Sequence, residues 1–181
     1  MFLNCRGVVA ALPQSPRASR FSKSFTPYIF TKKQIECILR SADTMPKTQG
    51  FFNINAVLPI ILRLLYCCGL RISEATALRI RHINLDQRTI TILHSKNDDC
   101  RIVPMSESLK DIITAYLEKI HAAPKDDDFV FPTHKGERYS SRTIYDRFRE
   151  ILWRSNISHG GRGLGPRLHD IRHTFAAKAD S

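Results

Sequence analysis

Two arginine-bearing segments, about a hundred residues apart, carry the residue types best suited to chemistry in this chain. The first, 66–74, reads Tyr-Cys-Cys-Gly-Leu-Arg-Ile-Ser-Glu, which indicates the end of an apolar helix, a glycine stop and a new helix that we expect Ser73 to cap. In the second, His169 and Arg172 are three residues apart and share one face of a helix. The guanidinium groups of Arg71 and Arg172, brought together with one imidazole, would make a site for a phosphate.

Each of these residues also has a plainer interpretation. An arginine at the end of a helix often forms an ion pair, so Arg71 is open to pairing with Glu74 or Glu36. His169, at the start of its helix, is open to a bond with the backbone, and we interpret His173 as its structural neighbour. We expect Glu74 to support Arg71 through a charge-assisted hydrogen bond rather than to transfer protons.

The full amino-acid sequence of the two segments is more informative than the spacing of their charged residues. The strings Gly-Leu-Arg-Ile-Ser-Glu (69–74) and Leu-His-Asp-Ile-Arg-His-Thr-Phe-Ala (168–176) resemble the arginine motifs of the tyrosine recombinases, the phage-integrase family of DNA strand-exchange enzymes. The segment 95–104, Ser-Lys-Asn-Asp-Asp-Cys-Arg-Ile-Val-Pro, is similar to the β-hairpin of that family. The resemblance implies four catalytic residues and two that support them: Arg71, Lys96, His169 and Arg172, with Glu74 and His173.

The resemblance also implies a reaction. In this family a tyrosine attacks a DNA phosphate, which forms a 3′-phosphotyrosyl intermediate and releases a 5′-hydroxyl. The arginines would stabilise the charge on the five-coordinate phosphate, and Lys96 would protonate the leaving oxygen. The implied function is site-specific DNA recombination or integration without a metal ion or other cofactor. In the complete enzyme the resemblance implies self-association into a tetrameric synapse.

The tyrosines of this sequence do not lie where the family's nucleophile lies. The family's nucleophile follows the second arginine, whereas all five tyrosines of this sequence precede His169. We therefore expect a basic linker over residues 1–25 and an integrase-like catalytic domain over 26–181, incomplete at its C-terminal end and inactive alone. The alternative function is a non-catalytic DNA-binding fragment of such a recombinase. A third possibility is a basic helical domain without a phosphate site.

The charge of the chain favours a polyanionic partner. Its 28 Lys+Arg against 17 Asp+Glu give a net charge of +11. No apolar run is long enough to span a bilayer, so we predict duplex DNA rather than a membrane as the partner. Arg142 and Arg147 are expected to follow the DNA backbone in part, although Asp146 and Glu150 indicate a partly salt-bridged face. A cytoplasmic, nucleoid-associated protein of a prokaryote fits these features.

Metal and nucleotide sites are not indicated. The five cysteines are an odd number without a paired Cys-x-x-Cys spacing, which supports neither a zinc site nor a disulfide framework. The acidic triplet 126–128 is interpreted as a solvated turn. The glycine-rich segment 160–165 is not followed by Gly-Lys-Ser/Thr, so we interpret it as a flexible connector to the helix of His169.

The elements that position these residues are mostly helices. Thr31 and Gln34 form a capping-box pattern, and an almost wholly apolar segment with Pro59 near its start predicts a buried helix. Ser106, and Ser140 or Ser141, are expected to cap two later helices. The predicted fold is a mostly helical α+β domain, an integrase-like core with a small three-stranded antiparallel sheet. Its helices lie at about 31–42, 55–68, 73 onward, 106–120, 141–154 and 168 onward, and its strands at 81–85, 89–94 and 100–103.

Overall fold

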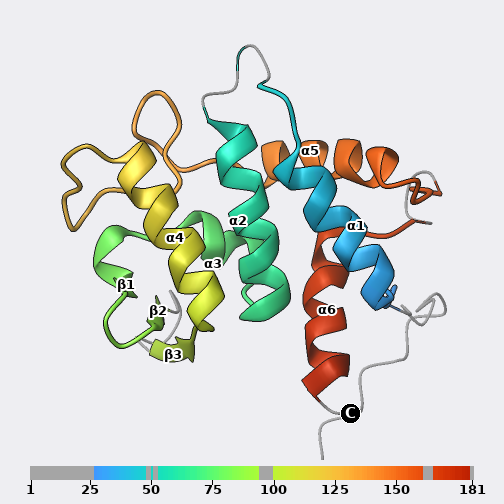
Figure 1. Cartoon of the computed structure of the whole chain (residues 1–181), viewed down its shortest axis with the longest axis horizontal. Helices are drawn as coiled ribbons and strands as arrows, with labels where there is room; N and C mark the ends of the chain where they lie inside the picture. Colours follow the sequence, from blue (N-terminus) through green and yellow to red (C-terminus); the bar gives the residue numbers. More distant parts are fainter. Residues whose placement is uncertain (1–26, 48–49, 51–52, 94–99, 161–164, 180–181) are drawn as a thin grey trace, which may run out of the picture.

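The centre of the fold is helix α2 (Ile54–Cys67), whose side chains are apolar on nearly every face. The computed structural model describes residues 27–47, 50, 53–93, 100–160 and 165–179. Helix α4 lies on one side of α2, α1 and α6 lie on the other, and α5 crosses one end (Figure 1). These four helices span Lys32–Asp43 (α1), Glu107–Ile120 (α4), Ser141–Arg154 (α5) and Leu168–Ala179 (α6).

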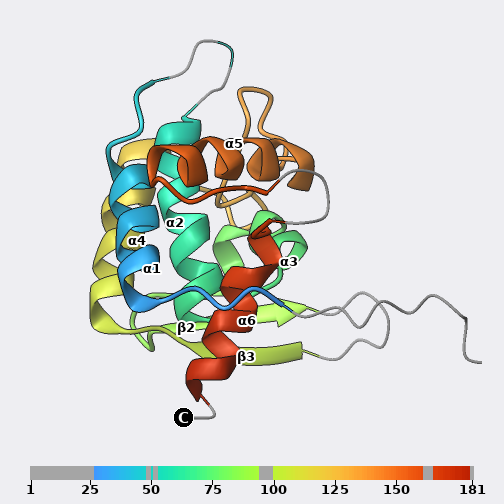
Figure 2. The same ribbon diagram turned by 90° about the vertical axis from the view of Figure 1, so that its right-hand side faces the viewer.

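The small sheet lies at the opposite end from α5 (Figure 2). Strands β1 (Ile83–Asn84), β2 (Thr89–Leu93) and β3 (Cys100–Pro104) are antiparallel in the order β1-β2-β3, as predicted. The first strand is shorter than expected because a 3-10 turn, η1 (Ile80–His82), occupies its predicted start. The turn is held by the Nδ1 atom of His82, which accepts a hydrogen bond from the Arg79 N–H at 3.1 Å.

Side-chain caps fix where three of the helices begin. The hydroxyls of Thr31, Ser106 and Ser140 each accept a backbone N–H from the first turn of α1, α4 and α5. The expected Ser73 cap is wrong. Helix α3 (Ile72–Thr76) begins immediately after Arg71, whose N–H donates to the Glu74 carboxylate, as the N-cap N–H does in a capping box.

A glycine turn joins α2 to α3, and α6 packs against α2 and closely approaches this turn. Gly69 has a φ of +60°, which L-residues with a side chain rarely adopt. A Cβ at this position would lie 2.6 Å from the ring of Phe175 on α6. Glycine is therefore needed for its backbone conformation and for the close approach of α6.

The segment before α1 also contacts α6. The Phe30 N–H donates to the buried hydroxyl of Thr174 at 3.0 Å, and this hydroxyl donates to the Asp170 carbonyl oxygen at 2.8 Å. Figure 2 shows the segment crossing over α6. The two ends of the described chain are thus joined at the helix that carries Arg172.

The fold class is confirmed as a mostly helical α+β domain with a small antiparallel sheet. Within the residues that the structure describes, no helix is long and apolar enough to cross a membrane. The predicted basic linker over residues 1–25 and the Lys96 hairpin turn lie outside the described residues.

Candidate phosphate-binding site

Arg71 and Glu74 form the base of the site at the start of α3. The Glu74 carboxylate accepts the Arg71 backbone N–H at 2.7 Å and the Arg71 Nη1 at 2.8 Å. Only 9% of the Glu74 side chain is exposed, whereas half of the Arg71 side chain is. The bond fixes one edge of the Arg71 guanidinium and leaves its other donors facing solvent, where a phosphate oxygen can accept them.

Arg172 reaches the same place from α6. Its Nη1 donates to the carbonyl oxygen of Gly69, the residue whose turn carries the chain into α3. The same Nη1 atom lies 3.9 Å from the Glu74 Oε2 atom. The structure therefore brings together the two arginines that the sequence predicted to meet, across 101 residues of chain.

A third arginine, Arg101 on β3, completes the cluster and was missed by the sequence interpretation. Its Nη2 and Nη1 atoms donate to the two oxygens of Glu74 at 2.7 and 3.1 Å. Arg101 is paired with buried Ile92 across the sheet, and it is more buried than Cys100 and Ile102 beside it. The signal was available in the alternation of β3, where an arginine occupies an inward-facing position.

One carboxylate surrounded by three guanidiniums leaves this cluster positive. Burial alone would raise the pKa of the Glu74 carboxyl, but hydrogen bonds from Arg101 and Arg71 lower its pKa to about 2. Burial, and then the Arg71 charge, lowers the pKa of Arg172, although an arginine stays protonated in a protein. With Glu74 ionised, the cluster has a net charge of about +2 and is suited to a phosphate group.

His169 and His173 lie together on α6, one turn apart. Their ring centroids are 4.9 Å apart and the rings meet edge to face. Burial, followed by the charges of His173 and Arg172, lowers the pKa of His169 from its usual 6.5. A neutral His169 has one N–H donor and one acceptor nitrogen near pH 7.

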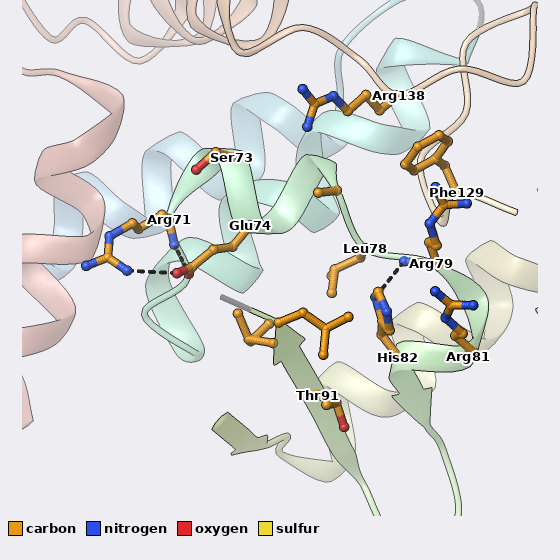
Figure 3. Close-up of a pocket in the computed structure, with 13 residues that line it drawn as sticks. Arg71, Ser73, Glu74, Leu78, Arg79, Arg81, His82, Thr91, Phe129 and Arg138 are labelled. Atoms are coloured by element: carbon orange, nitrogen blue, oxygen red, sulfur yellow. Dashed lines mark hydrogen bonds and ion pairs between the residues drawn. The ribbon is translucent and has the colours of Figure 1, made fainter. Parts of the chain in front are cut away.

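A groove of about 640 Å³ leads away from Arg71 along α3 and β2. Figure 3 shows Arg71 and Glu74 at one end and other basic side chains around the rest of it. At the far end the Arg79 guanidinium stacks on the Phe129 ring, 4.5 Å from its centroid. The basic residues that line the groove are Arg71, Arg79, Arg81, His82 and Arg138.

The two arginines predicted to follow DNA differ in their surroundings. Arg142 is 85% exposed, pairs with Asp146 at 3.1 Å, and lines a cavity of about 420 Å³ that His169 also lines. Arg147 is only 24% exposed and pairs with Glu150 at 2.9 Å. The structure therefore brings Arg142, and not Arg147, to the surface beside the site.

Most of the tyrosine hydroxyls are bound elsewhere. The Tyr116 hydroxyl is buried against the Val130 carbonyl oxygen, and Tyr139 is buried. The Tyr28 hydroxyl accepts from Gln34, and the Tyr145 hydroxyl lies 3.2 Å from the Nε2 atom of His159. The acidic triplet 126–128 is an exposed turn, as predicted.

Comparison with known proteins places the chain in a family. Residues 29–178 match the sequence profile of the Phage integrase family. The chain belongs to this family. Among curated phage integrases and recombinases it is similar to the tyrosine recombinase XerC of Shewanella oneidensis, with 36% identity over 116 residues that cover 64% of this chain and 36% of that protein. The chain spans about half the length, or less, of the first curated relatives it matches.

Solved structures of recombinases share the phage-integrase fold seen here. The XerA recombinase superposes with a TM-score of 0.69 and 22% identity, over 92% of this chain and 52% of XerA. The Tn1549 transposon integrase, solved in complex with transposon right end DNA, gives a TM-score of 0.65 and 18% identity, over 86% of this chain and 54% of that one. At these identities the likeness establishes the fold.

Proposed function

We propose that this chain is the catalytic core of a site-specific tyrosine recombinase, which cleaves and rejoins DNA strands through a 3′-phosphotyrosine. The observation that carries the proposal is the meeting of Arg71 and Arg172 around Glu74. Each guanidinium keeps donors that are not used within the cluster, and together they match the non-bridging oxygens of a phosphodiester. The site thus holds cations where negative charge develops in the transition state.

The roles of the remaining residues follow from this assignment. His169, neutral near pH 7, donates its N–H to a phosphate oxygen, and His173 holds the imidazole in place. Glu74 orients Arg71. Lys96 protonates the leaving 5′-oxygen, a role that rests on the resemblance of the 95–104 segment to the family's hairpin.

The attacking tyrosine is not assigned to any of the five tyrosines of this sequence. Each precedes His169, and Tyr116 and Tyr139 are buried. We propose that the nucleophile is supplied by polypeptide other than these 181 residues. In the absence of that segment the chain binds DNA without cleaving it, which is the second candidate function and is favoured by the same observation.

Duplex DNA is the proposed partner. The net charge of +11 and the basic groove that begins at Arg71 both favour a polyanion that passes over the site. The DNA-bound structure of the Tn1549 transposon integrase supports this choice, because its fold is shared. Assembly of four such cores on two DNA sites belongs to the same proposal.

A nicked duplex tests the proposal directly. The nick traps a covalent protein–DNA adduct, which survives a denaturing gel. We expect no adduct with the 181-residue chain alone, and an adduct when a segment carrying the C-terminal tyrosine of a recombinase relative is joined to it. An adduct formed by the unextended chain, and lost in Tyr145→Phe, would show that the nucleophile lies within these residues.

A further inference from the structure

The bonding of Glu74 indicates a role for Arg101 beyond a surface ion pair. A carboxylate has about four acceptor positions, two on each oxygen. Here Arg71 fills two of them and Arg101 fills the other two, one on each oxygen in both cases. Glu74 is therefore saturated, although a third arginine lies close by.

The neighbouring Arg172 shows what this saturation achieves. Its Nη1 atom is 3.9 Å from the Glu74 Oε2 atom, too far for a hydrogen bond, and donates to the Gly69 carbonyl oxygen instead. If the two positions held by Arg101 were open, Glu74 would be an underbonded, nearly buried carboxylate beside the Arg172 guanidinium. Arg172 would then turn to Glu74, and its donors would be lost to a phosphate.

We propose that Arg101 is a positioning residue of the phosphate site: it occupies Glu74 so that Arg71 and Arg172 keep their donors for a bound phosphate. This inference rests on the proposed function, because it assigns Arg101 to the site that binds the scissile phosphate. Arg101 acts through Glu74 and not by touching the phosphate. Its fork of two N–H groups is needed because both carboxylate oxygens must be held at once.

Inorganic sulfate is a suitable probe, because it mimics a phosphate and its charge does not change in mildly acidic or neutral solution. Binding to the 181-residue chain is followed by NMR on the side-chain N–H signals of Arg71 and Arg172. We expect Arg101→Met to weaken sulfate binding about tenfold, the scale of one charge-assisted hydrogen bond. Arg101→Lys keeps the charge but loses the fork. Its sulfate affinity should lie between those of the unmodified chain and Arg101→Met.

Second-site rescue tests whether Arg101 acts through Glu74. Glu74→Gln removes the carboxylate charge and one acceptor oxygen but keeps the shape of the side chain. In the Arg101→Met background, Glu74→Gln should therefore restore most of the sulfate affinity, because no charged acceptor remains to capture Arg172. If the double variant binds as weakly as Arg101→Met, the loss does not act through Glu74 and the positioning role is wrong. The double variant also restores the net charge of the cluster, so Arg101→Lys separates positioning from charge. If Arg101→Lys binds sulfate as tightly as the unmodified chain, charge alone accounts for the loss and the positioning role is wrong.

A matched control is available elsewhere in the fold. Arg63 makes a similar two-bond fork to Asp43, with both distances 2.8 Å, between α2 and α1. Arg63→Met should leave sulfate binding unchanged, which separates the loss of an ion pair from an effect on the site. If circular dichroism shows that Arg101→Met does not fold, Arg101→Lys takes its place, and sulfate binding is compared with and without Glu74→Gln.

The outcomes separate this inference from the function on which it rests. If sulfate gives no saturable shift of Arg71 and Arg172 in the unmodified chain, both the phosphate site and the role of Arg101 are wrong. If the unmodified chain binds sulfate and Arg101→Met binds equally well, the phosphate site stands and only the role of Arg101 is overturned.

Discussion

At the scale of single residues, the candidate site depends on how one carboxylate is shared among three arginines. Glu74 is ionised and almost buried, and it fixes Arg71 without neutralising the site. Arg172 is anchored by a backbone carbonyl, which takes one donor and leaves its charge in place. The site is thus preorganised before any phosphate binds, as electrostatic stabilisation of a transition state requires.

Arg172→Ala measures this stabilisation. In a chain extended with the C-terminal tyrosine segment, we expect cleavage of a nicked duplex to lose about 2.7–4 kcal/mol of transition-state stabilisation, the range for one lost oxyanion donor. DNA affinity should change little. Arg149→Ala, which removes an exposed charge from α5, is the control and should cleave at the normal rate. Unchanged cleavage by Arg172→Ala would place Arg172 outside the site.

The shifted carboxyl of Glu74 predicts how stability depends on pH. Its pKa is about 2 in the folded chain, against an ordinary value of 4.5, so the unfolded chain binds more protons between these values. The stabilisation from ionised Glu74 is fully present above pH 4.5 and is lost as the pH falls towards 2. Urea unfolding at several pH values should therefore show a shallower acid-side loss of stability in Glu74→Gln than in the unmodified chain. Equal slopes would contradict the shift.

At the scale of elements, the turn between α2 and α3 decides where α6 can lie. Gly69 combines a positive φ with a ring of α6 in the space that a side chain would occupy. The same residue supplies the carbonyl oxygen that Arg172 binds. One turn therefore sets the position of α6 and the anchor of Arg172, the arginine that we propose to be catalytic.

Gly69→Ala should cost more stability than Gly136→Ala, although both glycines have a positive φ. A left-handed backbone costs an L-residue about 1–2 kcal/mol, and here the new methyl group also meets the Phe175 ring. Gly136 is the matched control, because its φ is +75° and nothing lies within 4 Å of a Cβ there. Urea unfolding should show a larger loss for Gly69→Ala than for Gly136→Ala. Equal losses would mean that the contact with Phe175 costs nothing.

Sequence patterns predicted most elements because local forces decide them. The Thr31–Gln34 capping box and the apolar α2 were readable, since caps and hydrophobic period act over a few residues. The start of α3 was misplaced by preferring Ser73 as the cap, when Glu74 reaches back to Arg71 instead. Arg101 was overlooked because its partner lies 27 residues away, on another element. The meeting of Arg71 with Arg172 was predicted from the family resemblance, not from local pattern.

At the scale of the whole molecule, positive charge is gathered along one groove. The groove begins at Arg71 and is also lined by Arg79, Arg81 and Arg138 (Figure 3). Its arginines are not equally available, since Arg81 pairs with Asp127. We therefore expect the DNA backbone to be followed over more than one phosphate, without base-specific contacts from these residues.

Binding to duplex DNA should be weak, salt-sensitive and nearly blind to sequence. Anisotropy titrations of a labelled duplex at two salt concentrations should show affinity falling steeply as salt rises. Arg138→Gln should lower the slope of log affinity against log salt by about one, as expected when one phosphate contact is lost. Arg40→Gln on α1 should leave the slope unchanged. An affinity that does not change with salt concentration would rule out DNA as the partner.

The bond between Gly69 and Arg172 also determines when this site can exist during synthesis of the protein. The chain leaves the ribosome from its N-terminus, so α2, α3 and the sheet are available long before α6. Until α6 emerges, Glu74 has Arg71 and Arg101 around it but lacks the second phosphate-binding arginine. On the proposed function, we expect a nascent chain at that stage to bind DNA loosely through its basic groove without holding a phosphate between the two arginines. On the same proposal, we therefore expect strand cleavage only from chains whose α6 has been translated.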